Sequence, residues 1–537
     1  MISKQLLLGL SMLCSLSAAA QEPRPAFTIA DVHDSPHRAF PFSNGGDLKG
    51  DRYLLRQSTI VDMIAKAYSV DPEMVQEGPS WLEMKRFDIV AKAAPTTSPA
   101  DLKLMLQSLL AERFKLVLHK GEAPMPAFLI TAPGGKSKLK PAEEGEDHQD
   151  CKPSSTPETA GGAPLIVVSC TGMTADEITS FMHDAANGYF TKPVVNQTGL
   201  EGRWDFTIKW TGMGNRAKAG ADSISAFDAL EKQLGLKVEL KTAPRPVWIV
   251  DSVNEKPTPN SADVAKELPD PPPAQFEVAT IKPSKSDEPP MGRIANGQMN
   301  ITAMSLKFLI TFAWDINPNN PDMIVNAPKW LDEAKFDMVA KMAAPEPVAG
   351  KRPAQTSLDD EEFRQMIRAL LIERFKMQVH MDDQPIDAYT MVSDHPKLKP
   401  ADPKSRTHCK EGPGPDGKDP RSANPVLNML ISCQNMTTEQ MGQQFTQFAA
   451  GYIYSPVKDA TGLKGTYDFT LNWSSANQTI LKPPPPPSNG QPQPSEPDMT
   501  LSFYDAVDRQ LGLKLVKEKR PTPVLVIDHI EATPTEN

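Results

Sequence analysis

The sequence has no excess of positive charge and, after its first 20 residues, no long hydrophobic run. Its 537 residues include 57 Lys and Arg against 67 Asp and Glu, which gives a formal net charge of −10. Surfaces that bind nucleic acids or anionic membranes are usually basic, and a membrane-spanning helix needs about 20 predominantly apolar residues. We therefore expect no nucleic-acid partner and no transmembrane segment once the leader is removed.

Established catalytic motifs are also missing. The chain contains no H-E-x-x-H, G-x-S-x-G, Walker-type glycine loop or C-x-x-C, and no S-x-x-K at the start of an expected helix, which are patterns typical of metalloproteases, serine hydrolases, nucleotide-binding enzymes, redox proteins and β-lactamases. We predict no catalytic residue, no metal ligand and no cofactor. Whether the protein is an enzyme stays open, although the absence of motifs favours a non-catalytic role.

The first 20 residues have the pattern of a secretory signal peptide. Lys4 supplies a positive charge, an apolar run follows from Leu6 to Leu16, and three alanines end at Ala20. We predict cleavage after Ala20 and a periplasmic or secreted protein. Cys14 leaves a lipoprotein as an alternative, but bulky Leu13 stands where a lipoprotein signal has a small residue.

Cysteine is rare, and its distribution is regular. Apart from Cys14, the chain has four cysteines, which fall two by two along the sequence: Cys151 with Cys170, and Cys409 with Cys433. An even number in an exported chain indicates disulfides. Three connectivities are possible, and the duplication described next favours pairing within each half. A zinc site using His148 or His408 is disfavoured, because the two His-Cys spacings differ.

The chain contains two copies of one long repeat unit. WLEMKRFDIVAK from Trp81 to Lys92 returns as WLDEAKFDMVAK from Trp330 to Lys341, and LLAERFK is matched by LLIERFK, each followed by a histidine, His119 or His380. We divide the chain into a signal peptide, two repeat units and a proline-rich linker. Their boundaries are 1–20 for the signal peptide, 21–255 for unit 1, 256–273 for the linker and 274–537 for unit 2.

The first half of each unit combines strands and helices. Alternating apolar residues after Phe27 and Phe276 predict a strand, and apolar residues spaced by three and four predict helices over 58–68 and 305–314. A second helix follows the Phe-Asp strand in each unit. Ser98 with Asp101, and Ser357 with Asp360, have the spacing of a helix cap.

The second half of each unit follows the same order of elements. Thr174 with Glu177, and Thr437 with Gln440, predict a capping box, and a strand containing Asp-Phe and a second Leu-rich helix follow. Two expected strands that flank a proline close each half. The sequence therefore predicts an α+β protein made of two tandem repeats, each with two small modules whose helices pack on one face of a sheet.

These motifs resemble a known family. The Phe-x-x-Ala strand, PxWL-x4-FD-x-VAK, LL-x-ERFK with its histidine, the cysteine pair, TGL-x-G-x-[WY]-DF and QLGLK are similar, in both units, to the soil-associated family of exported bacterial proteins, a domain of unknown function. The resemblance implies an extracytoplasmic sensing or interaction role and establishes no reaction. The order of elements is also similar to the short N-terminal domains of secretins and TonB-dependent receptors, an analogy of fold that does not determine function.

The candidate site residues are few. His119 and His380 follow a helix in each unit, but the sequence shows no partner that would orient either one as a base. Trp81 and Trp330 could line a groove, although regularly spaced tryptophans more often pack in a core. We expect structural roles for three further pairs of residues: Asp88 and Asp337 as solvated or turn-capping carboxylates, Trp210 and Trp473 as core residues, and Asp251 and Asp528 as strand residues rather than members of a triad.

Two classes of function remain after these exclusions. A non-catalytic binding protein, with a protein or peptide as partner and envelope sensing as one role, agrees with duplicated small modules and missing motifs. An extracytoplasmic hydrolase would need a concave site with convergent polar groups. A deep pocket containing His119 or His380 beside a carboxylate would favour the hydrolase, and an open sheet edge would favour binding.

Overall fold

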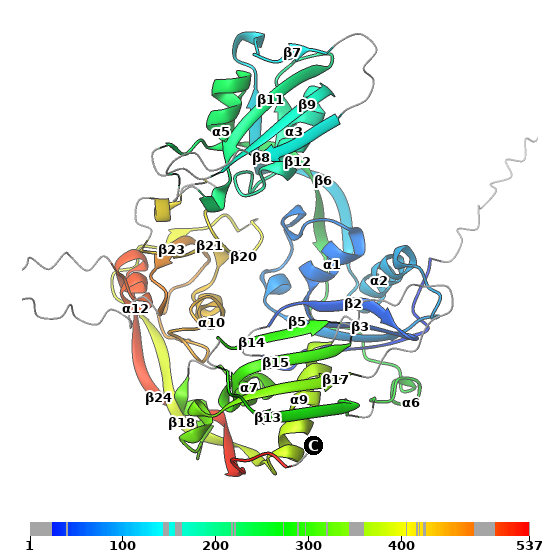
Figure 1. The fold of residues 1–537 in the computed structure, drawn as a ribbon, viewed down its shortest axis with the longest axis vertical. Helices are drawn as coiled ribbons and strands as arrows, with labels where there is room; N and C mark the ends of the chain where they lie inside the picture. Colours follow the sequence, from blue (N-terminus) through cyan, green and yellow to red (C-terminus); the bar gives the residue numbers. More distant parts are fainter. Residues whose placement is uncertain are drawn as a thin grey trace, which may run out of the picture.

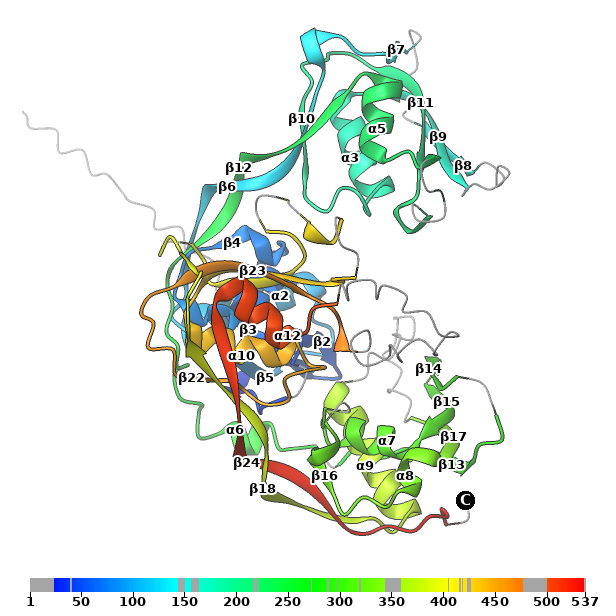
Figure 2. The same cartoon turned by 90° about the vertical axis from the view of Figure 1, so that its left-hand side faces the viewer.

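The computed structural model describes most of the chain between residues 24 and 535. Gaps lie at 39–40, 143–149, 156–163, 216–218, 220–221, 272, 287–288, 296, 318–319, 343–358, 404, 415–416, 418, 423–425 and 477–499. The expected signal peptide with Cys14, His148, Ser357 and the proline-rich segment 482–497 lie outside the described residues. The described part contains four small α+β modules joined in pairs by long two-stranded ribbons (Figures 1 and 2).

We name the modules N1 (24–116), C1 (132–236), N2 (273–377) and C2 (393–512), so that N1 and C1 form unit 1 and N2 and C2 form unit 2. Each module has a four-stranded sheet with two helices packed on one face. This arrangement confirms the predicted α+β fold with tandem, internally duplicated units.

The two N modules share one strand order, edge to edge. In N1 the order is β1 (Ile29–Asp34), β5 (Arg86–Lys92), β3 (Arg52–Thr59) and β2 (Asn44–Lys49), with helices α1 (Ile60–Tyr68) and α2 (Pro99–Arg113). In N2 the order is β13 (Val278–Pro283), β17 (Lys335–Lys341), β15 (Gln298–Ser305) and β14 (Met291–Ala295), with helices α7 (Leu306–Ala313) and α9 (Asp360–Arg374).

The two C modules also share a strand order. In C1 it is β7 (Lys140–Pro141), β11 (Trp204–Thr211), β9 (Leu165–Met173) and β8 (Asp150–Ser155), with α3 (Ala175–Ala185) and α5 (Ala226–Ala229), which continues as the π-helical η6 (Leu230–Leu234). In C2 it is β19 (Lys399–Pro400), β23 (Tyr467–Trp473), β21 (Met429–Met436) and β20 (His408–Glu411), with α10 (Thr438–Phe448) and α12 (Phe503–Ala506), which continues as η9 (Val507–Leu511).

One long antiparallel ribbon joins the two modules of each unit. Ribbon 1 pairs β6 (Val117–Thr131) with β12 (Lys237–Ser252), and ribbon 2 pairs β18 (Gln378–Ser393) with β24 (Leu513–His529). The expected pairs of short strands flanking a proline are wrong, because each pair is one continuous strand. Pro124, Pro244, Pro385 and Pro521 lie in the middle of the ribbons, where only two strands pair. Each strand is an edge there, so the missing N–H of a proline can face solvent.

Short strands and turns complete the modules. Near one end of each ribbon lies a parallel strand from the N module, β4 (Val75–Gln76) or β16 (Ile324–Val325), and near the other end lies one from the C module, β10 (Val194–Gln197) or β22 (Lys458–Asp459). The remaining short helices are η1 (Pro72–Met74), η2 (Ser80–Glu83), η3 (Pro133–Gly135), η4 (Met213–Asn215), α6 (Val264–Glu267), η7 (Pro321–Met323), α8 (Trp330–Glu333) and η8 (Pro420–Ser422).

A repeated β-bulge shows that the four modules are variants of one design. In each module, the strand before the first helix contains a residue with positive φ whose N–H donates to an aspartate on the neighbouring strand, and the helix N-cap follows two residues later. The four donor–acceptor pairs are Gln57 with Asp88, Gly172 with Asp205, Ala303 with Asp337, and Asn435 with Asp468. The Phe-Asp and Asp-Phe motifs therefore hold a bulge and help to set where a helix begins.

Helix caps agree with the sequence in three of the four predicted places. Ser98 caps α2, and the capping boxes of Thr174 and Thr437 are both formed. The cap predicted at Ser357 is wrong, because Asp359 caps α9 by accepting bonds from the N–H groups of Glu361 and Glu362. A carboxylate next to the helix start serves this purpose as well as a serine does.

The four modules differ in how closely they contact the rest of the molecule. In Figures 1 and 2, C1 lies at one end, joined to the rest by ribbon 1, whereas N1 lies beside modules of unit 2. Hydrogen bonds and ion pairs link N1 to both C2 and N2, so the two units contact one another extensively.

Candidate functional site

The predicted histidines have partners that sequence reasoning missed. His119 Nδ1 lies 2.9 Å from both carboxylate oxygens of Asp251, and His380 Nδ1 lies 2.8 Å from Asp528 Oδ2. Each aspartate is the residue skipped at a break in the ribbon's strand pairing, and a bulge of this kind redirects a side chain. The sequence did contain a sign of these partners, because both units end in a strand that carries an aspartate, Asp251 or Asp528.

These His-Asp pairs lie on open surface. The side chains of His119 and His380 are each 53% exposed, and those of Asp251 and Asp528 are 40% and 45% exposed. An aspartate that bonds Nδ1 orients the ring, as it does in a nucleophilic triad, and His and Asp are two of the three members of such a triad. Ser252, the residue after Asp251, pairs across the ribbon with Val117. The pairs therefore combine an oriented base with easy access for water.

The tryptophans belong to the cores. Trp81 in η2 and Trp330 in α8 are partly buried against the apolar cores of N1 and N2. Trp210 and Trp473 are each only 1% exposed, inside C1 and C2. All four tryptophans therefore have a core role.

The buried aspartate of N1 differs from the expected solvated group. Asp88 is 3% exposed, accepts from Gln57 N and pairs with Arg56, whereas Asp337 is only partly buried. Of the two expected roles, the solvated one is wrong for Asp88, because a neighbouring module covers its face of the sheet. Asp88 instead accepts a backbone N–H at the bulge.

Both predicted disulfides are formed. Cys151 bonds to Cys170 between β8 and β9, and Cys409 bonds to Cys433 between β20 and β21. In each case the two cysteines lie directly opposite one another in the sheet. Disulfides of this kind are typical of proteins that fold in an oxidising compartment.

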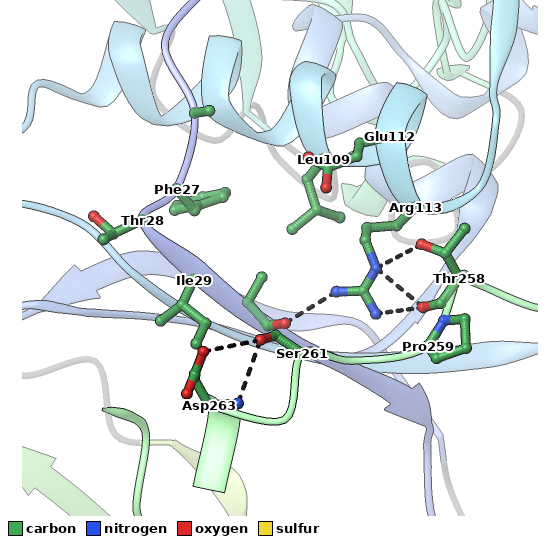
Figure 3. Close-up of a pocket in the computed structure, with 12 residues that line it drawn as sticks. Phe27, Thr28, Ile29, Leu109, Glu112, Arg113, Thr258, Pro259, Ser261 and Asp263 are labelled. Atoms are coloured by element: carbon green, nitrogen blue, oxygen red, sulfur yellow. Dashed lines mark hydrogen bonds between the residues drawn. The ribbon is translucent and has the colours of Figure 1, made fainter. Parts of the chain in front are cut away.

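A cavity of about 400 Å³ lies where the linker crosses N1 (Figure 3). Its main polar group, the Arg113 guanidinium, donates to the carbonyl and hydroxyl oxygens of Thr258, to Asn260 and to the carbonyl of Ala30. These contacts hold the chain that leaves ribbon 1 against α2 and β1. The arginine of the repeated ERFK motif is therefore a structural anchor.

Unit 2 repeats this anchor. Thr535 N donates to the carbonyl of Arg374, as Thr258 N donates to that of Arg113, and Arg374 reaches the carbonyl of Ala279. A second cavity, bordered by Arg520, Glu439 and residues 456–459, lies beside α10 and β22. Neither cavity includes His119 or His380, so neither provides the deep histidine pocket that would favour a hydrolase.

The surface between N1 and C2 is polar and partly buried. Arg406 of C2, 5% exposed, donates to the carbonyls of Pro72 and Val75 and pairs with Glu83, whose other oxygen lies 2.6 Å from His408 Nδ1.

Glu73 joins three modules. Lys410 from C2 and Lys192 from C1 lie 2.8 and 2.9 Å from its carboxylate. Burial raises the pKa of Glu73, but the hydrogen bonds and charges of the two lysines outweigh burial and lower that pKa to about 2.

A second contact covers the outer face of the N1 sheet. Asp359 at the N-cap of α9 pairs with Arg56, and acidic residues in the first turn of α9 pair with two further cations of N1. These additional pairs are Arg38 with Glu361 and Asp360, and Lys49 with Glu362. Acidic groups at a helix N-terminus also complement the helix dipole.

The corresponding surface of N2 is open. Four outward positions of β5, namely 86, 88, 90 and 92, are partly or fully buried, while their equivalents on β17, namely 335, 337, 339 and 341, are exposed or only partly buried. Edge strand β14 is exposed at four of its five residues, including Met291 at 63% and Ile294 at 46%. N2 therefore presents an exposed edge strand, with Met291 and Ile294 on either side of Arg293, beside a sheet face that none of the described modules covers.

Comparison with known families agrees with the duplication. The family described as "Protein of unknown function (DUF3738)" matches residues 61–253 and 307–530. The chain belongs to the DUF3738 family. The two matched regions correspond to units 1 and 2, so this protein carries two DUF3738 copies in tandem. No curated protein and no solved structure matches the chain.

No helix in the described ranges is long and apolar enough to span a bilayer. Within the same ranges, no three side chains among His, Cys, Asp and Glu are grouped so that they could hold a metal ion.

Proposed function

We propose that this DUF3738 protein is an exported, non-catalytic binding protein whose contact surface is edge strand β14 with the adjoining outer face of the N2 sheet. The observation that carries the proposal is the exposure of β14. An exposed edge strand invites pairing with another chain, and β14 has exposed Met291 and Ile294 beside its single charged residue, Arg293. An edge left open in this way suits a partner that adds a strand.

The equivalent module supports this reading, because it shows the same face engaged. N1 and N2 share strand order, bulge and helices, yet the N1 face is covered by the acidic start of α9 through Arg56. N2 has Thr302 at the position of Arg56 and apolar Val278, 62% exposed, on its other edge strand. We therefore expect a protein or peptide partner held by main-chain pairing and apolar contacts.

The proposed location follows from the leader and the disulfides. A signal peptide ending at Ala20 would deliver the chain to an oxidising compartment, where both disulfides are stable. We further infer that the protein belongs to the soil-associated exported branch that its motifs resemble, with envelope sensing as one role.

Site-specific photocrosslinking tests the binding surface. A photoreactive residue is placed at Ile294 of the full-length chain, and a matched control has it at Val516, which is 50% exposed on ribbon 2. We expect irradiation of the exported fraction to give a defined adduct from position 294 and not from 516. Met291→Lys, introduced into the chain that carries the photoreactive residue at 294, should abolish the adduct. Equal adducts at both positions, or an adduct with a second copy only, would contradict the proposal.

An extracytoplasmic hydrolase is the alternative, and the His-Asp pairs are the observation that favours it. The variant His119→Ala with His380→Ala removes both oriented imidazoles from exposed positions. If the parent hydrolyses a peptide, ester or glycan substrate and the double variant does not, the non-catalytic proposal is overturned. Unchanged crosslinking at position 294 without parent turnover supports binding.

A further inference from the structure

Each disulfide lies against a third sulfur atom. Met173 Sδ is 3.1 Å from Cys151 Sγ in C1, and Met436 Sδ is 2.9 Å from Cys409 Sγ in C2. The methionine stands three residues after the second cysteine in both modules, at C-T-G-M and C-Q-N-M. Two cysteines and one methionine are therefore gathered twice in one chain.

The β-bulge builds this cluster. In a regular strand, residues three apart point to opposite faces. Between Cys170 and Met173 the pairing with β11 shifts at Gly172, and Asp205 accepts the Gly172 N–H, so both sulfur side chains are buried on the same side. The same shift occurs at Asn435 between Cys433 and Met436.

The N modules form the same bulge without this sulfur set. Leu55 and Ser58 occupy the equivalent positions in N1, and Ile301 and Met304 occupy them in N2. The fold therefore does not require three sulfurs at this place, and their presence in both C modules calls for a chemical reason.

Two thiolates and a thioether form a soft ligand set. Such ligands favour Cu(I), whereas zinc sites use Cys, His, Asp and Glu, and methionine is not among them. His408, next to Cys409, is turned to Glu83. The ligand chemistry therefore points to a monovalent soft metal with three sulfur donors.

We propose that each C module, when its disulfide is reduced, binds one Cu(I) ion through Cys151, Cys170 and Met173, or through Cys409, Cys433 and Met436. The disulfide form is closed to the metal because the cysteine sulfurs are bonded to each other. The site thus loads only under reducing conditions, and it does not depend on the partner surface of N2.

The reduction balances with a dithiol as reductant. The dithiol gives two electrons and two protons to the protein disulfide, its own sulfurs form a disulfide, and the protein gains two thiols. Cu(I) then takes the place of the two thiol protons, which pass to water. Cys151 and Cys409 are partly exposed on edge strands β8 and β20, while Cys170 and Cys433 are buried, so an attacking thiolate can approach the edge sulfur.

Cu(I) competition tests the proposal on the full-length mature chain. The protein is reduced anaerobically with dithiothreitol, freed of reductant and titrated with Cu(I) against a chromophoric Cu(I) chelator. We expect two Cu(I) per reduced chain and none per oxidised chain, with a shell of three sulfurs in copper X-ray absorption.

Methionine variants separate coordination from simple thiol binding. Met173→Leu and Met436→Leu keep the side-chain volume, and each should weaken one site at least about tenfold. The controls Met182→Leu and Met441→Leu replace buried methionines on α3 and α10, and they should change nothing. Equal binding by oxidised and reduced protein, or unchanged affinity and sulfur shell in both Met173→Leu and Met436→Leu, would overturn the proposal.

Discussion

N1 and N2 have the same fold and different surroundings. Both bury a phenylalanine of the Phe-Asp motif in the core, Phe87 in N1 and Phe336 in N2. On the outer face, N1 has Arg56 paired with Asp359 of unit 2, whereas N2 has Thr302 and an open strand β14. Duplication has thus preserved the interior, which is set by packing, and has allowed the exterior to diverge.

Replacing a core phenylalanine should lower the free energy of unfolding equally in N1 and N2, and this is the largest effect we expect. Phe87→Ala and Phe336→Ala each remove a fully buried ring that packs edge-on against another, Phe114 or Phe375. Each should cost about 3–5 kcal/mol in the free energy of unfolding of its module. Hydrogen exchange resolved by module measures this, and a difference well above 1 kcal/mol would show that the cores are not equivalent.

A substitution on the covered face of N1 should destabilise the protein, whereas the matched substitution in N2 should not. Arg56→Ala leaves Asp88 and Asp359 without their shared cation, and a buried carboxylate that loses its partner destabilises the fold by about 1–3 kcal/mol. Thr302→Ala, the matched change in N2, should stay within about 0.5 kcal/mol. Hydrogen exchange at the start of α9 should increase in Arg56→Ala, and protection equal to that of the parent would contradict the contact.

The three-module junction gives a pH-dependent comparison. The pKa of Glu73 is lowered to about 2, below its ordinary value of 4.5, so the stabilisation exists above pH 4.5 and is lost as the pH falls towards 2. Glu73→Gln should remove this part of the acid dependence of stability. The measurement is hydrogen exchange, as a function of pH, of the backbone amides at the contact between N1 and C2. Asp322→Asn, at the equivalent place in N2, is the control. If both variants lose the same amount of acid dependence, the three-module junction is not its cause.

The smallest effect tests surface exposure. Val339 lies on the open face of N2 and is 43% exposed. Val339→Lys should therefore change the free energy of unfolding by less than about 0.5 kcal/mol. Val90→Lys, at the same place in N1, should destabilise more, because that position is partly buried. Thermal unfolding of the two variants side by side decides this, and equal shifts would mean that the N1 face is as open as that of N2.

The candidate site was only partly predictable. His119 and His380 could be selected because both units repeat them, but Asp251 and Asp528 are more than 130 residues away along the chain. Only the pairing of β6 with β12, and of β18 with β24, together with a bulge, brings each aspartate to its histidine. Met173 and Met436 could not be grouped with the cysteines from the sequence for a similar reason, since a regular strand would point them away from the cysteines.

What the sequence determined by itself is whatever depends on local or repeated patterns. Duplicated motifs defined the two units, apolar periodicity defined the α+β modules, and paired cysteines predicted both disulfides. Only the tertiary structure decided which surfaces meet: that Asp88 is buried, that prolines lie within continuous ribbons, and that N1 is covered while N2 is open. These outcomes depend on contacts between residues far apart in the chain, and no local propensity specifies such contacts.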